Sequence, residues 1–92
     1  MNRAERIRAA IEAALAPDAL EIEDESHLHA GHAGARAEGE THYRVTVVSD
    51  AFSGQSRVAR QRTVDGLLHL EFEGGLHALS VRALTPEEQS PT

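Results

Sequence analysis

The sequence contains no cysteine and no lysine, and its only aromatic residues are Tyr43, Phe52 and Phe72. The absence of cysteine excludes disulfide bonds, thiolate nucleophiles and metal sites built from cysteine alone. With so few aromatic side chains, the core must be built mainly from leucine, isoleucine, valine and alanine. The longest uninterrupted apolar run, Ala13 to Ala16, is far shorter than a membrane span or the core of a signal peptide.

The formal net charge is −6, which works against non-specific binding to nucleic acids or anionic membranes. The charge is unevenly distributed along the chain. Five acidic residues lie in the stretch from Asp18 to Glu25, whereas no acidic residue lies between Asp50 and Asp65. That second stretch holds three of the arginines, so a local basic surface remains compatible with an acidic protein.

The length of 92 residues and the hydrophobic content of 40% predict one compact domain, which would bury roughly 60–65% of its unfolded surface. We expect this domain to extend over residues 1–88 and residues 89–92 to form a frayed tail. Because the sequence shows no recognisable targeting segment, we expect a cytoplasmic protein.

Two segments show the hydrophobic periodicity of an amphipathic helix. The first covers residues 3–16, and Pro17 ends it. The second begins after Ser56, a typical N-cap residue, and ends at Gly74-Gly75. Its expected buried stripe consists of Val58, Val64, Leu67, Leu68 and Phe72.

Three segments alternate apolar and polar residues as half-buried strands do, and they cover residues 20–23, 42–48 and 77–83. The first two are expected to form an antiparallel hairpin with a long connection over residues 24–40. A strand, a helix and a strand in series predict a crossover to a parallel third strand. With a short last helix starting at Thr85-Pro86, the order is α–β–β–α–β(–α). It predicts an α+β fold with a three-stranded mixed sheet and helices on one face.

His77 heads the apolar row of the third strand, where a side chain can face core and solvent together. It is either a structural residue or a metal ligand, since neutral imidazole is a common metal donor. His42 begins a strand and is expected to serve packing or hydrogen bonding, and His69 is expected on a helix surface. The connection carries a His-x-His-x-x-His pattern, which can reach one metal ion but is also typical of solvated loops; its members are His27, His29 and His32.

Arg57, Arg60 and Arg62 form either a docking surface on the second helix or a solvated face with local ion pairs. The connection also matches the Gly-x-x-Gly with which KH domains clamp a nucleic-acid backbone. In KH domains this loop joins two helices and is flanked by positive charge, whereas here it joins strands and has acidic residues on both sides. No nucleophile, base or carboxylate pair stands in a recognisable catalytic arrangement. The sequence therefore predicts a protein that is not an enzyme.

Several blocks in consistent order resemble the BolA family: Asp24-Glu25-Ser26 before a histidine-bearing loop, Glu40-Thr41-His42-Tyr43-Arg44-Val45, Phe52-x-Gly54-x-Ser56-x-Val58-x-Arg60-x-Arg62, Gly75-Leu76-His77-Ala78-Leu79-Ser80 and Thr85-Pro86-Glu87. The resemblance runs through nearly the whole chain. It implies a class II KH-like fold without the nucleic-acid-clamping loop.

The resemblance also implies a function as an adaptor in iron–sulfur cluster handling. BolA proteins pair with monothiol glutaredoxins and share a 2Fe–2S cluster, which glutaredoxin cysteine and glutathione hold on the other side. The family's ligand near the third strand corresponds to His77 in this chain. Its loop ligand corresponds to His29 when counted from Ser26, whereas counting back from Thr41 falls next to His32. A chain without cysteine can contribute only nitrogen or oxygen donors, and histidine replaces cysteine at some 2Fe–2S irons.

A second class of function is a KH-like nucleic-acid-binding transcriptional regulator. The fold, the family members regarded as regulators and the arginines of the second helix favour this alternative. The net acidity and the position of the Gly-x-x-Gly match count against it. A third alternative is a protein-interaction domain whose histidines bind metal adventitiously.

Overall fold

The computed structural model describes residues 2–26 and 41–89. Its sheet has the strand order β1-β2-β3, formed by Ala19–Asp24, His42–Val48 and Ala78–Leu84. The central strand β2 runs antiparallel to β1 and parallel to β3, and its register pairs Val45 with Ile22 on one side and with Val81 on the other. This architecture confirms the predicted three-stranded mixed sheet.

Helix α1 extends over Arg3–Leu15 and is fixed at its start by a capping box. Asn2 Oδ1 accepts the N–H of Glu5 at 2.8 Å, and the N–H of Asn2 donates to Glu5 Oε1 at 3.0 Å. These two bonds satisfy backbone donors that the first turn leaves without partners. One stripe of this helix is buried, and it includes Ile7, Ile11 and Leu15.

The crossover from β2 to β3 starts with a short 3-10 helix, η2, over Asp50–Phe52. It continues with α2 over Arg57–Leu67 and α3 over His69–Glu73. A last short helix, α4, follows β3 and extends over Pro86–Gln89. The second helix was predicted as one continuous element, and this prediction was wrong. The chain leaves helical geometry at Leu68, with φ −108° and ψ 16°. Gly66, the residue that weakens the helix locally, lies two positions before the break.

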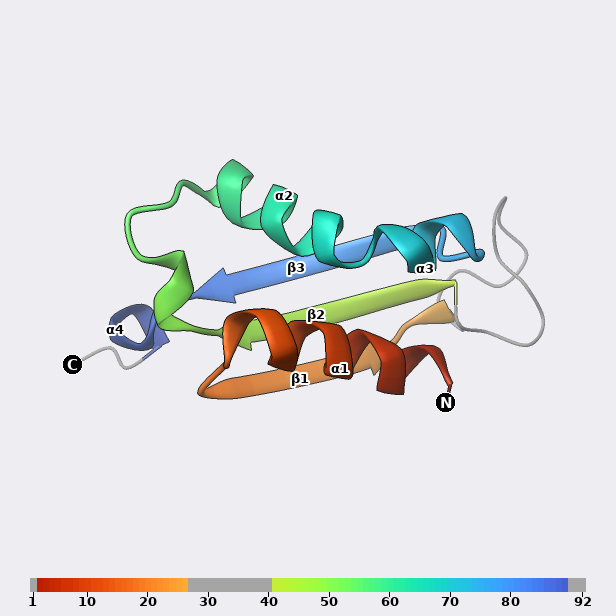
Figure 1. Ribbon diagram of the computed structural model, residues 1–92, viewed down its shortest axis with the longest axis horizontal. Helices are drawn as coiled ribbons and strands as arrows, with labels where there is room; N and C mark the ends of the chain where they lie inside the picture. The colour runs from red at the N-terminus through yellow and green to blue at the C-terminus, as the bar shows by residue number, and fades with distance from the viewer. Residues whose placement is uncertain (1, 27–40, 90–92) are drawn as a thin grey trace.

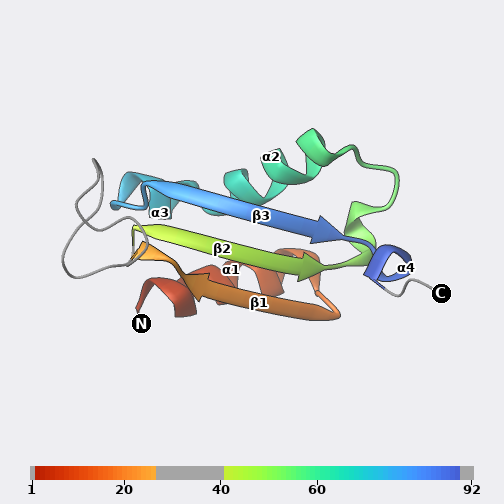
Figure 2. The ribbon, with the colours of Figure 1, turned by 180° about the vertical axis from the view of Figure 1, so that it is seen from behind.

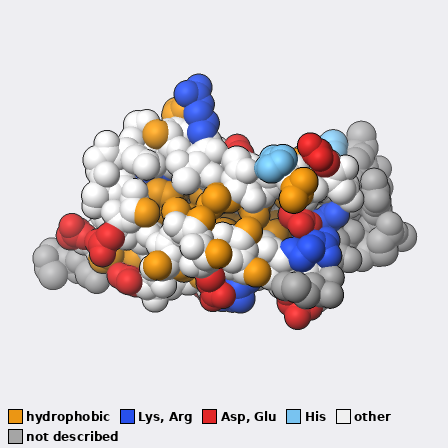
Figure 3. Space-filling view, viewed as in Figure 1, with side chains coloured by type: hydrophobic (Ala, Val, Ile, Leu, Met, Phe, Trp, Pro, Cys, Tyr) orange, Lys and Arg blue, Asp and Glu red, His pale blue; other side chains and the backbone are white. Residues whose placement is uncertain are grey.

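Helices α1, α2 and α3 lie on the same side of the sheet, and the opposite side of the strands is uncovered along most of its length (Figures 1 and 2). Short α4 sits at the end where β3 finishes (Figure 1). Hydrophobic side chains gather in the middle of the helical side, between α1 and α2 (Figure 3). This arrangement confirms the predicted α+β class with helices on one face.

The core lies between the sheet and the helices. It includes Ile7, Ile11, Val45, Val47, Phe52, Val64 and Leu68, each at most 1% exposed. Phe52 comes from the short helix η2 and is completely buried. Val58 was predicted in the buried stripe of α2, and it is 57% exposed. Val58 lies about 120° around the helix from Val64, the buried residue of α2, so this prediction was wrong.

Candidate functional site

His77 lies immediately before β3 on a backbone that neighbouring contacts fix. Its N–H donates to the carbonyl oxygen of Thr41 at 2.8 Å, and the N–H of Ala78 donates to the same oxygen at 3.1 Å. The preceding Leu76 is buried, and its N–H donates to Glu71 at 2.9 Å. The side chain of His77 is exposed. The result is a solvent-facing imidazole on a rigid support.

His42, the first residue of β2, lies beside His77 although 35 positions separate the two in the sequence. The ring centroids are 5.3 Å apart and the rings are tilted by 50°. Unlike His77, His42 is buried, with 7% of its surface exposed. The parallel pairing of β2 with β3 places Ala78 opposite His42, and this register brings the two imidazoles together.

A hydrogen-bond network around Ser26 holds His42 in place. Ser26 Oγ accepts the N–H of Thr41 at 2.9 Å and the N–H of His42 at 3.1 Å. Thr41 Oγ1 lies 3.3 Å from Ser26 Oγ and 2.9 Å from Nδ1 of His42. Bonding at Nδ1 fixes the orientation of the ring. His42 is therefore buried and hydrogen-bonded, as predicted.

The same network closes the base of the β1–β2 connection. Ser26 and Thr41 are the last and first described residues on either side of residues 27–40, and their hydrogen bond joins the two ends. The N–H of Glu25 also donates to the carbonyl oxygen of His42 at 2.7 Å. The loop histidines His29 and His32 lie outside the described residues.

Within residues 2–26 and 41–89, no group of three or more histidine, aspartate or glutamate side chains is arranged to hold a metal ion. The described part of the chain therefore supplies a histidine pair at this end of the sheet. His69 is the remaining histidine among the described residues. It is exposed on α3, and its Nδ1 lies 3.1 Å from the carbonyl oxygen of Gly66. It lies on a helix surface, as predicted.

The structure does not combine the three arginines of α2 into one surface. Arg60 is folded into the protein: Nε donates to the carbonyl oxygen of Gln55 at 2.9 Å, and Nη1 donates to that of Ala83 at 3.0 Å and to Glu88 Oε1 at 2.6 Å. Arg57 and Arg62 are exposed. Five positions on an α-helix turn a side chain by about 140°, so these two point in different directions.

The ion pair of Arg60 changes the acidity of its partner. The hydrogen bond from Arg60, helped by the N–H of Thr85, lowers the pKa of Glu88 from 4.5 to about 2. A second ion-paired cluster ties α1 to α3, where Arg6 and Arg3 donate to Glu71 at 2.9 Å and 3.0 Å. The hydrogen bond from Arg6 is the largest cause that lowers the pKa of Glu71, and its partial burial opposes the shift.

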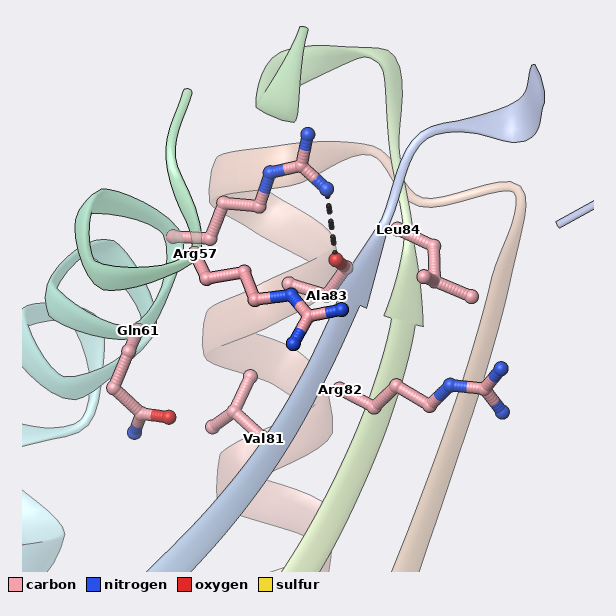
Figure 4. Close-up of a pocket in the computed structure, with 7 residues that line it drawn as sticks. Arg57, Gln61, Val81, Arg82, Ala83 and Leu84 are labelled. Carbon is pink, nitrogen blue, oxygen red and sulfur yellow. Dashed lines mark hydrogen bonds between the residues drawn. The ribbon is translucent and has the colours of Figure 1, made fainter. Parts of the chain in front are cut away.

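A hollow of about 400 Å³ lies between α2 and the second half of β3 (Figure 4). Its lining includes Arg57, Gln61 and Arg82 but no histidine, serine or carboxylate. It therefore offers no nucleophile or general base.

Comparison with known proteins identifies the family. A family model described as BolA-like protein matches residues 11–88. The chain is 50% identical over 91 residues to SufE-like protein 1, chloroplastic/mitochondrial, of Arabidopsis thaliana, an alignment that covers 95% of this chain and 24% of that protein. It is 45% identical over 94 residues to UV-induced protein uvi31 of Schizosaccharomyces pombe, covering 98% and 92% of the two chains.

Solved structures agree. The BolA domain of SufE1 from Arabidopsis thaliana superposes with a TM-score of 0.87 at 49% identity, covering 96% of each chain. BolA1 from Mus musculus gives a TM-score of 0.74 at 46% identity, covering 89% of this chain and 63% of that one. The chain belongs to the BolA-like protein family, as the sequence blocks predict.

The chain spans 24% of the length of the SufE-like relative and 56% of Protein BOLA1, chloroplastic, from the same plant. Within the described residues, no helix has the length and apolar character needed to cross a bilayer.

Proposed function

We propose that this chain is an adaptor in iron–sulfur cluster handling, which forms a heterodimer with a monothiol glutaredoxin and shares a 2Fe–2S cluster with it as cargo. The observation that carries the proposal is the exposed imidazole of His77 on a rigid backbone, beside His42 and beside the base of the histidine-bearing loop. Membership in the BolA family supports the choice of partner and cargo.

The donor set fits a shared cluster and does not fit a cluster held by this chain alone. A 2Fe–2S cluster takes four protein ligands, and imidazole replaces thiolate on one iron in some clusters. Without cysteine, this chain can supply nitrogen donors, and thiolates must come from glutaredoxin and glutathione. The cluster would supply the electron-accepting and transferable iron. The chain would bind and orient one side of it.

His77 is the first proposed ligand because its imidazole reaches solvent while its backbone cannot move freely. His42 would act behind it, since its ring is buried, held at Nδ1 and packed against the ring of His77. In this role His42 limits the orientations that His77 can adopt.

His29 or His32 is the proposed second ligand. Ser26 and Thr41 are hydrogen-bonded, and Thr41 also bonds the backbone of His77, so the loop starts beside the proposed site. Three residues of extended chain reach about 10 Å and six reach about 20 Å. Either histidine therefore has the reach to approach His77 from Ser26.

Reconstitution tests this proposal. The purified chain would be mixed with a monothiol glutaredoxin, ferrous iron, sulfide and glutathione, and visible absorption and size-exclusion profiles would be recorded. We expect a coloured heterodimer whose spectrum differs from that of the glutaredoxin homodimer, and no stable cluster on this chain alone. A stable coloured form of the isolated chain would contradict the proposal.

Variants assign the ligands in the same assay. His77→Ala should return the spectrum to that of the glutaredoxin homodimer, and the double change His29→Ala with His32→Ala should act in the same direction. His69→Ala is the matched control, because His69 is also exposed but lies on α3. A duplex-DNA titration of the same preparation tests the regulator alternative, and sequence-selective nanomolar binding would favour that alternative instead.

A further inference from the structure

Strand β3 forms an open edge of the sheet, because the strand order is β1-β2-β3. The N–H of Ala78 donates to Thr41, and the carbonyl oxygen of Leu84 accepts the N–H of Ser49, so the backbones of these even-numbered positions face β2. Successive residues of a strand direct their backbone groups to opposite sides. Leu79, Val81 and Ala83 therefore direct theirs outward. The bond from Arg60 to the Ala83 carbonyl oxygen agrees with this direction.

The hollow between α2 and β3 runs along this outward edge, beside Val81 and Ala83. In Figure 4, Arg57 and Gln61 extend from α2 toward β3, while Arg82 leaves β3 on the side away from α2. Arg60 closes the end of the hollow by binding the Ala83 carbonyl oxygen. Among the described residues, no hydrogen bond occupies the outward backbone groups of Leu79 or Val81. The edge is thus open where the hollow adjoins it.

The hollow is positively charged in an otherwise acidic protein. Arg57 and Arg82 are exposed, and in the described part of the chain no carboxylate lies within 4.0 Å of either guanidinium. Glu88 neutralises Arg60, and no acidic residue lines the hollow. Against a net charge of −6 for the chain, Arg57 on the α2 side of β3 and Arg82 on the opposite side offer one cation each to an anionic group (Figure 4).

We propose that the β3 edge accepts an extended acidic segment of a partner protein as an additional strand. The segment's backbone would bond Leu79 and Val81, as in other strand-addition complexes. Adjacent side chains of a strand point to opposite faces, and Arg57 and Arg82 lie on opposite faces of the edge. Two consecutive acidic residues would therefore place one carboxylate near each arginine. The recognised feature is an acidic pair within a β-forming segment.

A peptide strand fits this surface better than a nucleic acid does. The outward N–H and C=O groups of a strand edge match the alternating donors and acceptors of another peptide backbone, whereas a phosphate backbone carries acceptors only. Two arginines without an acidic partner would also release few counterions from a duplex, and counterion release supplies much of the affinity for nucleic acids. The phosphate backbone of a nucleic acid would supply no donor to the edge carbonyl groups.

This site is separate from the proposed cluster site. His77 precedes the first residue of β3, whereas the hollow adjoins residues 81–84 near its last residue. The backbone contacts of an added segment would begin at Leu79, about 7 Å of strand beyond His77, and would continue toward Val81 and away from His77. The chain would then hold a glutaredoxin at one end of β3 and an acidic partner at the other, and the second contact does not depend on the first.

The test uses a fluorescein-labelled peptide with two adjacent glutamates between valines and threonines, and a second peptide with glutamines in their place. Anisotropy titrations would measure affinity, and amide NMR spectra of the full chain would locate the contact. We expect shifts at the amides of Leu79, Val81 and Ala83, and about tenfold weaker binding of the glutamine peptide, as expected for two exposed charge pairs.

The double variant Arg57→Glu with Arg82→Glu should bind the glutamate peptide with an affinity at least about tenfold lower. Arg62→Glu changes a neighbouring exposed arginine of α2 outside the hollow, and should leave affinity within about twofold. His77→Ala should not alter peptide binding, which separates this result from the cluster proposal.

Equal binding of both peptides, or unchanged amides at Leu79 and Val81, would overturn the proposal. An oligonucleotide that binds this edge more tightly than the peptide would also overturn it. Self-association that depends on protein concentration and is abolished by the arginine changes would overturn it as well. In that case the segment bound at the β3 edge would be the acidic edge strand β1 of a second copy.

Discussion

The guanidinium of Arg60 joins the start of α2, the end of β3 and α4 through the carbonyl oxygens of Gln55 and Ala83 and the carboxylate of Glu88. Its carbon Cζ also lies 5.9 Å from the ring centroid of Phe52, within the range of a cation–π contact. Arg60 is thus a structural residue, while the exposed arginines of α2 remain available to partners.

Replacing Arg60 by alanine should destabilise the protein by about 1–3 kcal/mol, because two partly buried carbonyl oxygens lose a charged donor. Urea unfolding followed by circular dichroism would measure this change. Arg62→Ala serves as the control, since an exposed side chain without such contacts should change stability by less than about 0.5 kcal/mol. Equal effects of the two changes would show that the Arg60 contacts do not contribute to stability.

Residue roles that depend on distant partners cannot be read from local pattern. Arg3 shares the helical stripe of the buried α1 residues, although arginine side chains are mostly exposed in proteins. It is 8% exposed, because its guanidinium bonds Glu71 and the carbonyl oxygen of Gly74 at 2.9 Å. Those partners are about 70 positions away, so only the packed fold reveals them. The neighbourhood of His42 and His77 is hidden for the same reason.

At the scale of elements, hydrophobic period and capping chemistry predict most boundaries. Asn2, Ser56 and Thr85-Pro86 mark helix starts by local chemistry, and the strands follow the alternation of their residues. The break at Leu68 had only the weak signal of Gly66, because neither proline nor a capping side chain precedes it. Leu68 is itself 1% exposed, so the residue at the break packs into the core.

The hairpin of β1 and β2 has its own test in Ser26, which is 4% exposed and accepts two backbone N–H groups. Ser26→Ala would leave those donors without an acceptor, which costs about 1–3 kcal/mol. We expect faster hydrogen exchange at the amides of Thr41 and His42, measured by NMR.

Ser53→Ala is the control for that change, since Ser53 is exposed after η2. It should leave exchange at Thr41 and His42 unchanged. Unaltered exchange in Ser26→Ala as well would mean that Ser26 does not hold the base of the loop.

At the scale of the whole molecule, two ion pairs tie separate helices together: Glu71 links α3 to α1, and Glu88 links α4 to α2. Both carboxyl groups have a lowered pKa in the folded state. A group whose pKa is lower in the folded than in the unfolded state binds protons preferentially when unfolded. Its stabilisation is complete above the unfolded pKa and is lost as the pH falls through the folded value.

For Glu88 the window lies between 4.5 and about 2. The stability difference between the native protein and Glu88→Gln should therefore be largest near neutral pH and shrink across this window. Urea unfolding at several pH values would measure it. Glu87→Gln changes the adjacent exposed acid and should show no comparable shrinkage; a parallel response of both variants would refute the contribution of the Arg60 pair.

The overall architecture was predictable because each element carries its own periodic signal and the strand–helix–strand order determines a parallel third strand. The candidate site was predictable only in part. His77 stands out as a polar residue in an apolar row, whereas its contact with His42 depends on sheet register. The open edge of β3 likewise becomes visible only when the strand order places β2 in the centre.

The central claim is that the imidazole of His77 ligates the cluster in the mixed complex with glutaredoxin. The most direct measurement is pulsed electron paramagnetic resonance of the reduced complex. For it, the histidines of this chain alone would be labelled with the nitrogen-15 isotope. We predict a strong nitrogen coupling that changes with the isotope and is lost in His77→Ala, but not in His69→Ala. A spectrum without histidine nitrogen coupling, or one that His77→Ala leaves unchanged, would contradict the account.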